Sequence, residues 1–154
     1  MQTAKELSVS LVNKPGRLAT MLDALNKGKV NLRALVVMDS GTRGTVRLVP
    51  DNMEAASTVL DKMNLDVEIN DVLLVEVSRQ SGAFRRICER LASEHLNIDY
   101  AYLSFSAEHG AKGGGVAIVR VNDLNKAQRI LGESTTNNHR RKQRQQVRRA
   151  VATY

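Results

Sequence analysis

The stretch Asn13-Lys-Pro-Gly-Arg-Leu18 opens a segment of sequence that occurs twice in this chain. The first copy runs on to Val30-Asn31-Leu32, and the second runs from Arg79-Gln-Ser-Gly-Ala-Phe84 to Leu96-Asn97-Ile98. At one constant offset the equivalent positions are Gly16 and Gly82, Leu18 and Phe84, Met21 and Ile87, Leu25 and Leu91, and Asn31 and Asn97. The repeat predicts that a strand, a glycine-containing turn, a helix and a second strand are encoded twice.

Hydrophobic periodicity predicts the elements around the first copy. Residues 7–11 alternate between apolar side chains and serine, which is typical of a half-buried strand. Pro15 and Gly16 predict a tight strand-to-helix turn, because proline fixes φ and glycine tolerates unusual backbone angles. A helix follows from Arg17 with an apolar stripe at helical spacing, and Gly28 is predicted to end it as a left-handed cap.

The rest of the first unit follows the same logic. Residues 30–38 are dense in Val and Leu and predict a strand buried partly on both faces, with residues 45–49 as its hairpin partner. Asp51 or Asn52 is the predicted N-cap of a second helix. Residues 65–69 alternate as a fourth strand, so the order of elements is βαββαβ.

The second unit repeats this order without a closing strand. The predicted elements are a strand at 73–77, a helix face at 84–91, strands at 98–105 and 116–121, and a helix capped by Asn122-Asp123. The intervening hairpin loop, residues 106–115, is longer than its counterpart. Residues 133–154 are polar and then basic, and we expect them to be loosely ordered or to form a short exposed helix.

These patterns predict an α+β fold made of two ferredoxin-like βαββαβ units. The expected organisation is unit 1 at residues 1–70, unit 2 at 71–132 and a basic C-terminal tail at 133–154. Small units bury little core when isolated, so we expect them to pack side by side, with antiparallel sheets and the helices on one face.

The composition indicates a soluble cytoplasmic protein. Hydrophobic residues make up 42% of the 154 residues and charged residues 25%. No apolar run approaches the ~18 residues that span a bilayer, and the first residues lack the apolar core of a signal peptide. One cysteine, Cys88, excludes an internal disulfide, and the three histidines lack metal-ligand spacing. We therefore expect no metal, no cofactor and no membrane partner.

The net charge of +7 is concentrated at the C-terminus. Residues 133–154 hold six Lys and Arg against one acid, which leaves a charge of +2 on the rest of the chain. Nucleic-acid binding through this tail is therefore an alternative function, with steep salt dependence. It is not favoured, because aromatic residues total 3% and no RNA-recognition signature occurs.

The Asn-x-Pro-Gly-x-Leu opening of the first helix, with Val30-Asn31-Leu32 after it, resembles the ACT domain. The duplicated pattern and the junction at residues 67–77 are similar to those of stand-alone tandem ACT-domain proteins, over about residues 5–131. This resemblance implies a regulator of amino-acid metabolism that binds an amino-acid effector at an interface between ACT-like units. It also implies a homodimer and an enzyme as a candidate partner.

Carried onto this chain, the resemblance implies a ligand site at the first strand-to-helix turn and the second strand. Its residues are Asn13, Lys14, Pro15, Gly16, Arg17, Leu18 and Asn31. A helix N-terminus suits a carboxylate because its N–H groups are unpaired and its dipole end is positive. The alternatives are that this turn binds nothing and that Asn31 only satisfies nearby backbone groups.

The second unit departs from the family pattern. A second candidate site comprises Arg79, Gln80, Ser81, Gly82 and Asn97, but proline is absent and arginine stands where the first unit has Asn13. Arg79 can grip a carboxylate with two parallel hydrogen bonds, or this unit serves only as an interface.

The sequence contains no acid–base pair, nucleophile constellation or cofactor motif, so we expect a protein that is not an enzyme. Cys88 lies on an apolar helix stripe and is predicted to be a core residue. Three hypotheses remain: an amino-acid-binding regulator, a nucleic-acid-binding protein, and a scaffold subunit that binds no ligand.

Overall fold

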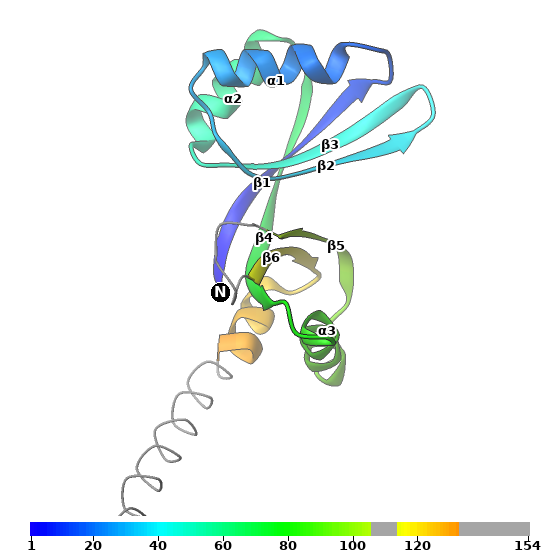
Figure 1. Cartoon of the computed structure of the whole chain (residues 1–154), viewed down its shortest axis with the longest axis vertical. Helices are drawn as coiled ribbons and strands as arrows, with labels where there is room; N and C mark the ends of the chain where they lie inside the picture. Colours follow the sequence, from blue (N-terminus) through cyan, green and yellow to red (C-terminus); the bar gives the residue numbers. More distant parts are fainter. Residues whose placement is uncertain (106–113, 133–154) are drawn as a thin grey trace, which may run out of the picture. The chain divides into compact units, whose positions relative to one another are not determined.

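The computed structural model describes residues 1–105 and 114–132. It divides into two compact units (Figure 1): the first is Thr3–Val72, and the second runs from Leu73 onward and includes Met1–Gln2. The hairpin loop predicted from residue 106 lies largely outside the described residues. The predicted tail at 133–154, with its expected conformations, lies outside them entirely.

The first unit is a sheet with two helices on one face. Its strand order is β2-β3-β1-β4, and β3 pairs antiparallel with both β1 and β2. The elements are β1 (Gln2–Val12), α1 (Arg17–Lys27), β2 (Leu32–Ser40), β3 (Arg43–Pro50), α2 (Met53–Lys62) and the first part of β4 (Asp66–Ser78). Figure 1 shows α1 and α2 on the same side of these strands.

The core of the first unit lies between the helices and the inner strands. Leu7, Val9 and Leu11 of β1 belong to this core, as the alternation with serine predicts. The fully buried members of this core are Leu7, Val9, Met21, Leu25, Val46, Leu48, Ala56 and Leu60. Burial of these side chains positions the turn between β1 and α1 and the hairpin between β2 and β3.

The second unit repeats this arrangement. The second part of β4 is followed by α3 (Ala83–Ser93), β5 (Ile98–Phe105), β6 (Gly114–Val121) and a helix over residues 124–132. The strand order is β4-β6-β5, and β6 pairs antiparallel with both neighbours. Its core is formed by Leu73, Val75, Val77, Leu91, Leu96, Ala117, Val119, Val121, Ala127 and Leu131.

The α+β fold, with antiparallel strands and βαββαβ-type units, is therefore confirmed. The N-cap of α2 is Asn52, whose side chain accepts a hydrogen bond of 3.0 Å from the Ala55 N–H. Asp123 caps the last described helix by accepting from the Lys126 N–H at 2.9 Å. The side-by-side packing of the two units stays a prediction.

The junction between the units differs from the prediction of two separate strands at 65–69 and 73–77. β4 is one continuous strand of 13 residues. The alternating apolar residues of both stretches fall at odd positions, but Leu74 in the second stretch is also apolar and is buried. Ile69 is 56% exposed and does not contribute to a buried strand face, contrary to the expected alternation.

The predicted burial of the second strand on both faces is wrong for two of its residues. Leu35 and Val37 are 37% and 50% exposed. They pair with Leu48 and Val46 and share the helix-covered face of the sheet. However, β2 comes first in the strand order, and neither side chain belongs to the core formed by the inner strands and helices. The edge position, which one sequence alone does not reveal, leaves them in solvent.

The predicted left-handed cap at Gly28 is also wrong. Gly28 has φ −76°, whereas Lys29 has φ 56° and takes the left-handed conformation. The equivalent residue of the second unit, His95, also has φ 56°. The left-handed residue that follows α1, and its equivalent in the second unit, therefore each carry a Cβ atom, and Gly28 has a different role.

Replacing Lys29 with glycine is expected to raise the free energy of unfolding by about 1 kcal/mol. The left-handed conformation costs a residue with a Cβ roughly 1–2 kcal/mol, and the greater chain entropy of unfolded glycine offsets part of the gain. Asn26→Gly is the control. Asn26 lies within α1, where glycine is unfavourable, so this substitution should lower the free energy of unfolding. Denaturant unfolding measures both, and a destabilised Lys29→Gly protein would contradict the expectation.

Candidate functional site

The turn between β1 and α1 ends in a glycine that opens the helix. Gly16 is the N-cap of α1, with φ 83° and no side-chain cap in the part of the chain described. Its carbonyl accepts from the Thr20 N–H at 2.9 Å, while the Arg17 N–H donates to the Lys14 carbonyl at 3.3 Å. Lys14, Pro15, Gly16 and Arg17 are exposed, and Leu18 packs partly against the core. The structure therefore brings these five predicted residues together at one turn.

The first turn of α1 differs from that of α2. The helix α2 has the side-chain cap of Asn52 and an acidic residue, Glu54, near its N-terminus. Neither α1 nor α3, both wholly within the described residues, has either feature. The N-terminal N–H groups of α1 and α3 therefore have no capping side chain and no acidic residue in the first helical turn, whereas those of α2 have both.

Asn13 is engaged by the neighbouring hairpin. Its Nδ2 donates to Asp39 Oδ1 and to the Gly41 carbonyl, each at 3.1 Å, and its backbone N–H donates to the Thr42 carbonyl at 3.0 Å. Asp39 Oδ1 also accepts from the Gly41 N–H at 2.9 Å. The amide hydrogens of Asn13 thus hold the tip of the β2–β3 hairpin.

Asn31 lies at the other end of α1. Its backbone N–H and its Nδ2 donate to the two carboxylate oxygens of Asp51, at 3.0 Å and 2.8 Å. The Asp51 N–H donates back to the Asn31 carbonyl at 2.9 Å. The hydrogen bond from the Asn31 side chain, followed by that from its backbone, lowers the pKa of the Asp51 carboxyl group.

Asn31 is therefore not part of the same local site as the turn at Gly16. An α-helix rises ~1.5 Å per residue, so the 11 residues of α1 separate the two ends by about 16 Å. Within the first unit, the structure does not bring Asn31 to the predicted turn residues.

The turn between β4 and α3 has the same local geometry although it lacks proline. Gly82 is the N-cap with φ 74° and accepts from the Arg86 N–H at 3.0 Å. The Ala83 N–H donates to the Gln80 carbonyl at 3.1 Å. The left-handed glycine, rather than the proline, is the feature that the two turns share.

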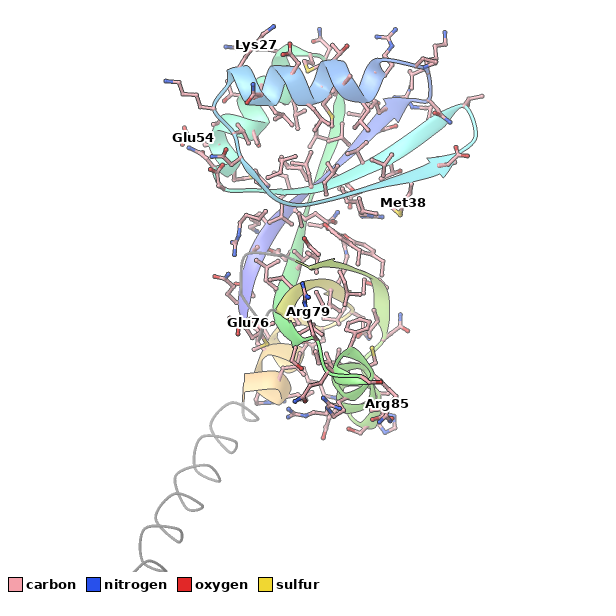
Figure 2. The ribbon with its side chains drawn as sticks, in the orientation of Figure 1. Lys27, Met38, Glu54, Glu76, Arg79 and Arg85 are labelled. Atoms are coloured by element: carbon pink, nitrogen blue, oxygen red, sulfur yellow. The ribbon has the colours of Figure 1, made fainter. Side chains whose placement is uncertain are left out.

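A pocket of about 490 Å³ opens beside this second turn. Its apolar lining includes Val77, Phe84 and Leu103. Its polar lining includes Arg79, from the segment after β4, and Arg85, from the first turn of α3, and both side chains are labelled in Figure 2. Three residues of the second candidate site, Arg79, Gln80 and Gly82, line this pocket.

Two guanidinium groups, one of them that of Arg85, lie close to Gly82. If Gly82 carried a Cβ atom, Arg85 Nε would lie 3.5 Å from it and Arg86 Nη1 3.6 Å. Arg85 forms an exposed ion pair with Glu89, and Arg86 Nη1 donates to the Ser81 carbonyl at 3.4 Å. In contrast, among the described residues no side chain from beyond Gly16 and its two chain neighbours lies within 4 Å of the same point at Gly16.

The sequence interpretation missed six residues that line this pocket: Val77, Ser78, Ala83, Phe84, Arg85 and Leu103. It also missed Arg86, which lies close to Gly82. A signal was available for the two arginines. They occupy the first turn of a helix, where a positive charge opposes the helix dipole and is unfavourable without a nearby anion.

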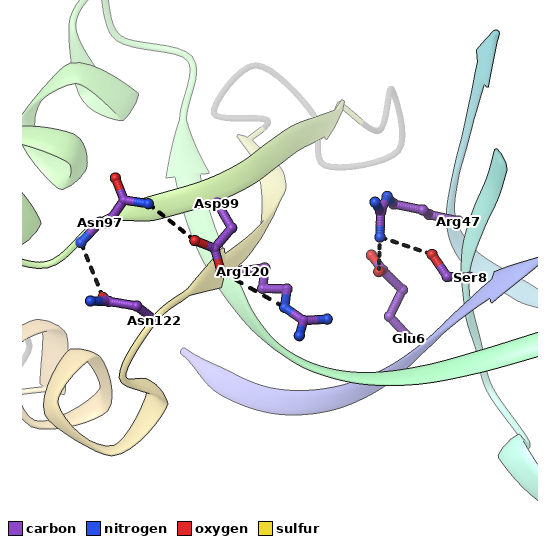
Figure 3. A network of polar contacts seen from close by, with 7 residues as sticks. All are labelled: Glu6, Ser8, Arg47, Asn97, Asp99, Arg120 and Asn122. Atoms are coloured by element: carbon purple, nitrogen blue, oxygen red, sulfur yellow. Dashed lines mark hydrogen bonds and ion pairs between the residues drawn. The ribbon is translucent and has the colours of Figure 1, made fainter. Parts of the chain in front are cut away.

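Asn97 repeats the backbone contact of Asn31, but its side chain has a different partner (Figure 3). Its backbone N–H donates to Asn122 Oδ1 at 3.1 Å, and its Nδ2 donates to Asp99 Oδ1 at the same distance. Asp99 in turn lies 3.9 Å from Arg120. Asn97 follows the C-terminal end of α3 and does not line the pocket at Gly82.

The described residues give little support to a metal site, a reactive cysteine or a membrane-spanning helix. No group of three or more His, Cys, Asp or Glu residues there has an arrangement suited to a metal ion. Cys88 is half-buried, and burial raises the pKa of its thiol, which disfavours the reactive thiolate. No helix between residues 1 and 132, outside the gap at 106–113, has the length and hydrophobicity needed to cross a membrane.

The duplicated unit, with a left-handed glycine opening the first helix of each copy, defines a pair of ferredoxin-like domains. The family model of the ACT domain pair matches residues 2–143. This chain belongs to the ACT domain pair family.

Solved structures with the same fold include proteins with regulatory descriptions. The chain is similar to protein BT0572 from Bacteroides thetaiotaomicron, with 26% identity and a TM-score of 0.78 over 86% of this chain and 89% of that one. It is also similar to the ligand-free regulatory subunit of aspartate kinase from Thermus thermophilus, with 14% identity and a TM-score of 0.60 over 85% and 91%. The corresponding subunit from Thermus flavus has 15% identity and a TM-score of 0.54 over 88% and 97%. At these identities the two kinase subunits share the fold alone, and a comparison with curated protein sequences found no match.

Proposed function

We propose that this protein is a regulator of amino-acid metabolism that binds an amino acid at its ACT-type turns and has no catalytic activity of its own. The observation that carries this proposal is the pocket beside Gly82, where apolar walls and guanidinium groups meet at a glycine-opened helix. The regulatory role is supported by the shared fold of proteins described as regulatory subunits of aspartate kinase.

The chemistry of the pocket suits an α-amino acid. A guanidinium group can bind an α-carboxylate with two parallel hydrogen bonds, and the N–H groups near Gly82 add a favourable dipole. Val77, Phe84 and Leu103 offer apolar contacts to the carbon chain of the ligand. The volume of about 490 Å³ is within the ordinary range of small-molecule pockets.

The first-unit site stays part of the proposal, together with a homodimer. Asn31 is separated from the turn at Gly16 by the length of α1, so a ligand that contacts both must lie between two ACT units. A second copy of the chain would supply such an interface. Ligand binding would then favour one arrangement of the interface, and the new arrangement would change contacts with a partner enzyme.

Isothermal titration calorimetry of the full chain against the twenty amino acids tests the proposal. At least one is expected to give a binding heat and to raise the melting temperature, because a ligand that binds only the folded state stabilises it. Neither signal with any of the twenty would contradict the proposed function.

A cavity-filling substitution tests the location of the ligand. Ala83 lines the pocket, so Ala83→Leu is expected to weaken binding at least about tenfold by occupying space that the ligand needs. Ala92→Leu is the control, because Ala92 is exposed near the other end of the same helix. Unchanged binding in the folded Ala83→Leu protein would show that the ligand binds elsewhere.

The two alternative functions give different results in these measurements. A scaffold subunit would dimerise without any response to amino acids. A nucleic-acid-binding protein would bind RNA with steep salt dependence, and deletion of residues 133–154 would abolish that binding. RNA affinity that survives the deletion would reject binding through the tail.

A further inference from the structure

We propose that the pocket beside Gly82 selects an amino acid with an apolar side chain. This inference rests on the proposed function and adds to it the chemical class of the ligand. It depends on the segments of the chain from which the polar and the apolar lining residues come.

The polar residues that line the pocket all come from one segment. Eight of the nine described lining residues belong to residues 77–85, which contain the turn at Gly82. The ninth is Leu103, which lies on β5. Among the described lining residues, the segment at the turn therefore supplies every polar side chain, whereas β5 contributes an apolar one.

Leu103 lies across the sheet from the strand that leads into the turn. It pairs with Ala117 on β6, and Ala117 pairs with Val75 on β4, so the three residues form one row across three strands. Neighbouring strands lie about 5 Å apart, which puts β5 about 10 Å from β4. A ligand that is held by its carboxylate at the turn after β4, and that fills the pocket, therefore directs its side chain toward Leu103.

The wall formed by Leu103 favours an apolar ligand side chain. Leu103 is a large hydrophobic residue that is 38% exposed, so a ligand that covers it removes apolar surface from water. Val77, Ala83 and Phe84 add apolar lining from β4 and α3. A polar ligand side chain would lose hydrogen bonds to water next to a leucine that cannot replace them.

The first unit has different residues at two of these positions. Ala83 corresponds to Arg17, and Gln80 corresponds to Lys14. Arg17 and Lys14 are both exposed, so the first turn carries two cations where the second has a small side chain and a neutral one. A preference for an apolar ligand should consequently depend on the second-unit pocket and not on the first turn.

Two matched ligand pairs test the inference by calorimetry on the full chain. L-leucine and L-asparagine have side chains of similar size and shape, as do L-methionine and L-glutamine. Within each pair one side chain is apolar and the other is an amide. The apolar member is expected to bind at least about tenfold tighter in at least one pair, because the amide loses hydrogen bonds to water at an apolar wall.

Substitution of Leu103 tests where this preference arises. Leu103→Asn places an amide in the wall and is expected to reduce the preference severalfold, with little effect on binding of the polar ligand. Leu103→Met keeps the wall apolar and should retain the preference. Leu35→Asn is the matched control, because Leu35 is 37% exposed on the edge strand β2 and does not line this pocket.

The outcomes separate this inference from the proposed function. Equal binding within both pairs, or tighter binding of the amides, would overturn the inference and leave the proposed function standing. No binding of any amino acid would overturn both. A preference that survives in the folded Leu103→Asn protein, or that falls equally in the Leu35→Asn protein, would overturn the assignment to this pocket.

Discussion

Replacing Leu91 with alanine is expected to lower the free energy of unfolding by about 2–5 kcal/mol, the range for deleting a fully buried leucine side chain. Leu91 lies on α3, is 0% exposed and belongs to the core that α3 forms with β4 and β6. The substitution removes apolar surface from the core and leaves a cavity that the neighbouring strands fill only in part.

Two further leucine-to-alanine variants test whether the cost of Leu91→Ala comes from burial. Leu25 is the equivalent residue of the first unit and is also buried, so Leu25→Ala should have a similar cost. Leu103 is 38% exposed on the edge strand β5, and Leu103→Ala should cost less than either. Urea unfolding measures all three, and equal costs for Leu91→Ala and Leu103→Ala would contradict the described core.

Replacing Gly28 with alanine is expected to lower the free energy of unfolding by about 1–3 kcal/mol, the usual cost of overpacking. A Cβ at Gly28 would lie 2.6 Å from Val59 Cγ2, well inside van der Waals contact. Gly28 follows α1 and Val59 lies on α2, so the added methyl group would push the two helices of the first unit apart.

A double-mutant cycle separates this steric effect from a backbone effect. Val59→Ala removes the clashing methyl group, so Gly28→Ala should cost less in the Val59→Ala background than in the natural chain. The equivalent residue in the second unit is Glu94, with φ −104°, so the backbone at this position accepts a side chain. Strictly additive costs in the cycle would contradict the contact between Gly28 and Val59.

Much of the fold could be predicted because its signals are local or repeated. The alternation of apolar residues with serine in β1 and the helical stripe from Arg17 reflect which face of each element is buried. The bounds of β5 agree with the predicted Ile98–Phe105. Because equivalent residues of the two copies are a constant number of positions apart, each element predicted in one unit also predicted its counterpart in the other.

The features that sequence reasoning missed depend on neighbours that are distant along the chain. The exposure of Leu35 and Val37 follows from the edge position of β2, and the need for Gly28 follows from the approach of Val59. The hydrogen bonds of Asn13 to the β2–β3 hairpin and of Asn31 to Asp51 also join residues that are 20 or more positions apart. None of these partners has a signature in a short window of sequence.

The sequence by itself determined the duplicated α+β architecture, because hydrophobic period and glycine position are properties of each short segment. It also located both glycine-opened helices, at Gly16 and at Gly82. Only the tertiary structure decided which of the two turns adjoins the described pocket of about 490 Å³. The physical reason is that a pocket requires walls from several elements, here the end of β4, the start of α3 and Leu103 on β5, and these elements meet only when the sheet and its helices pack together.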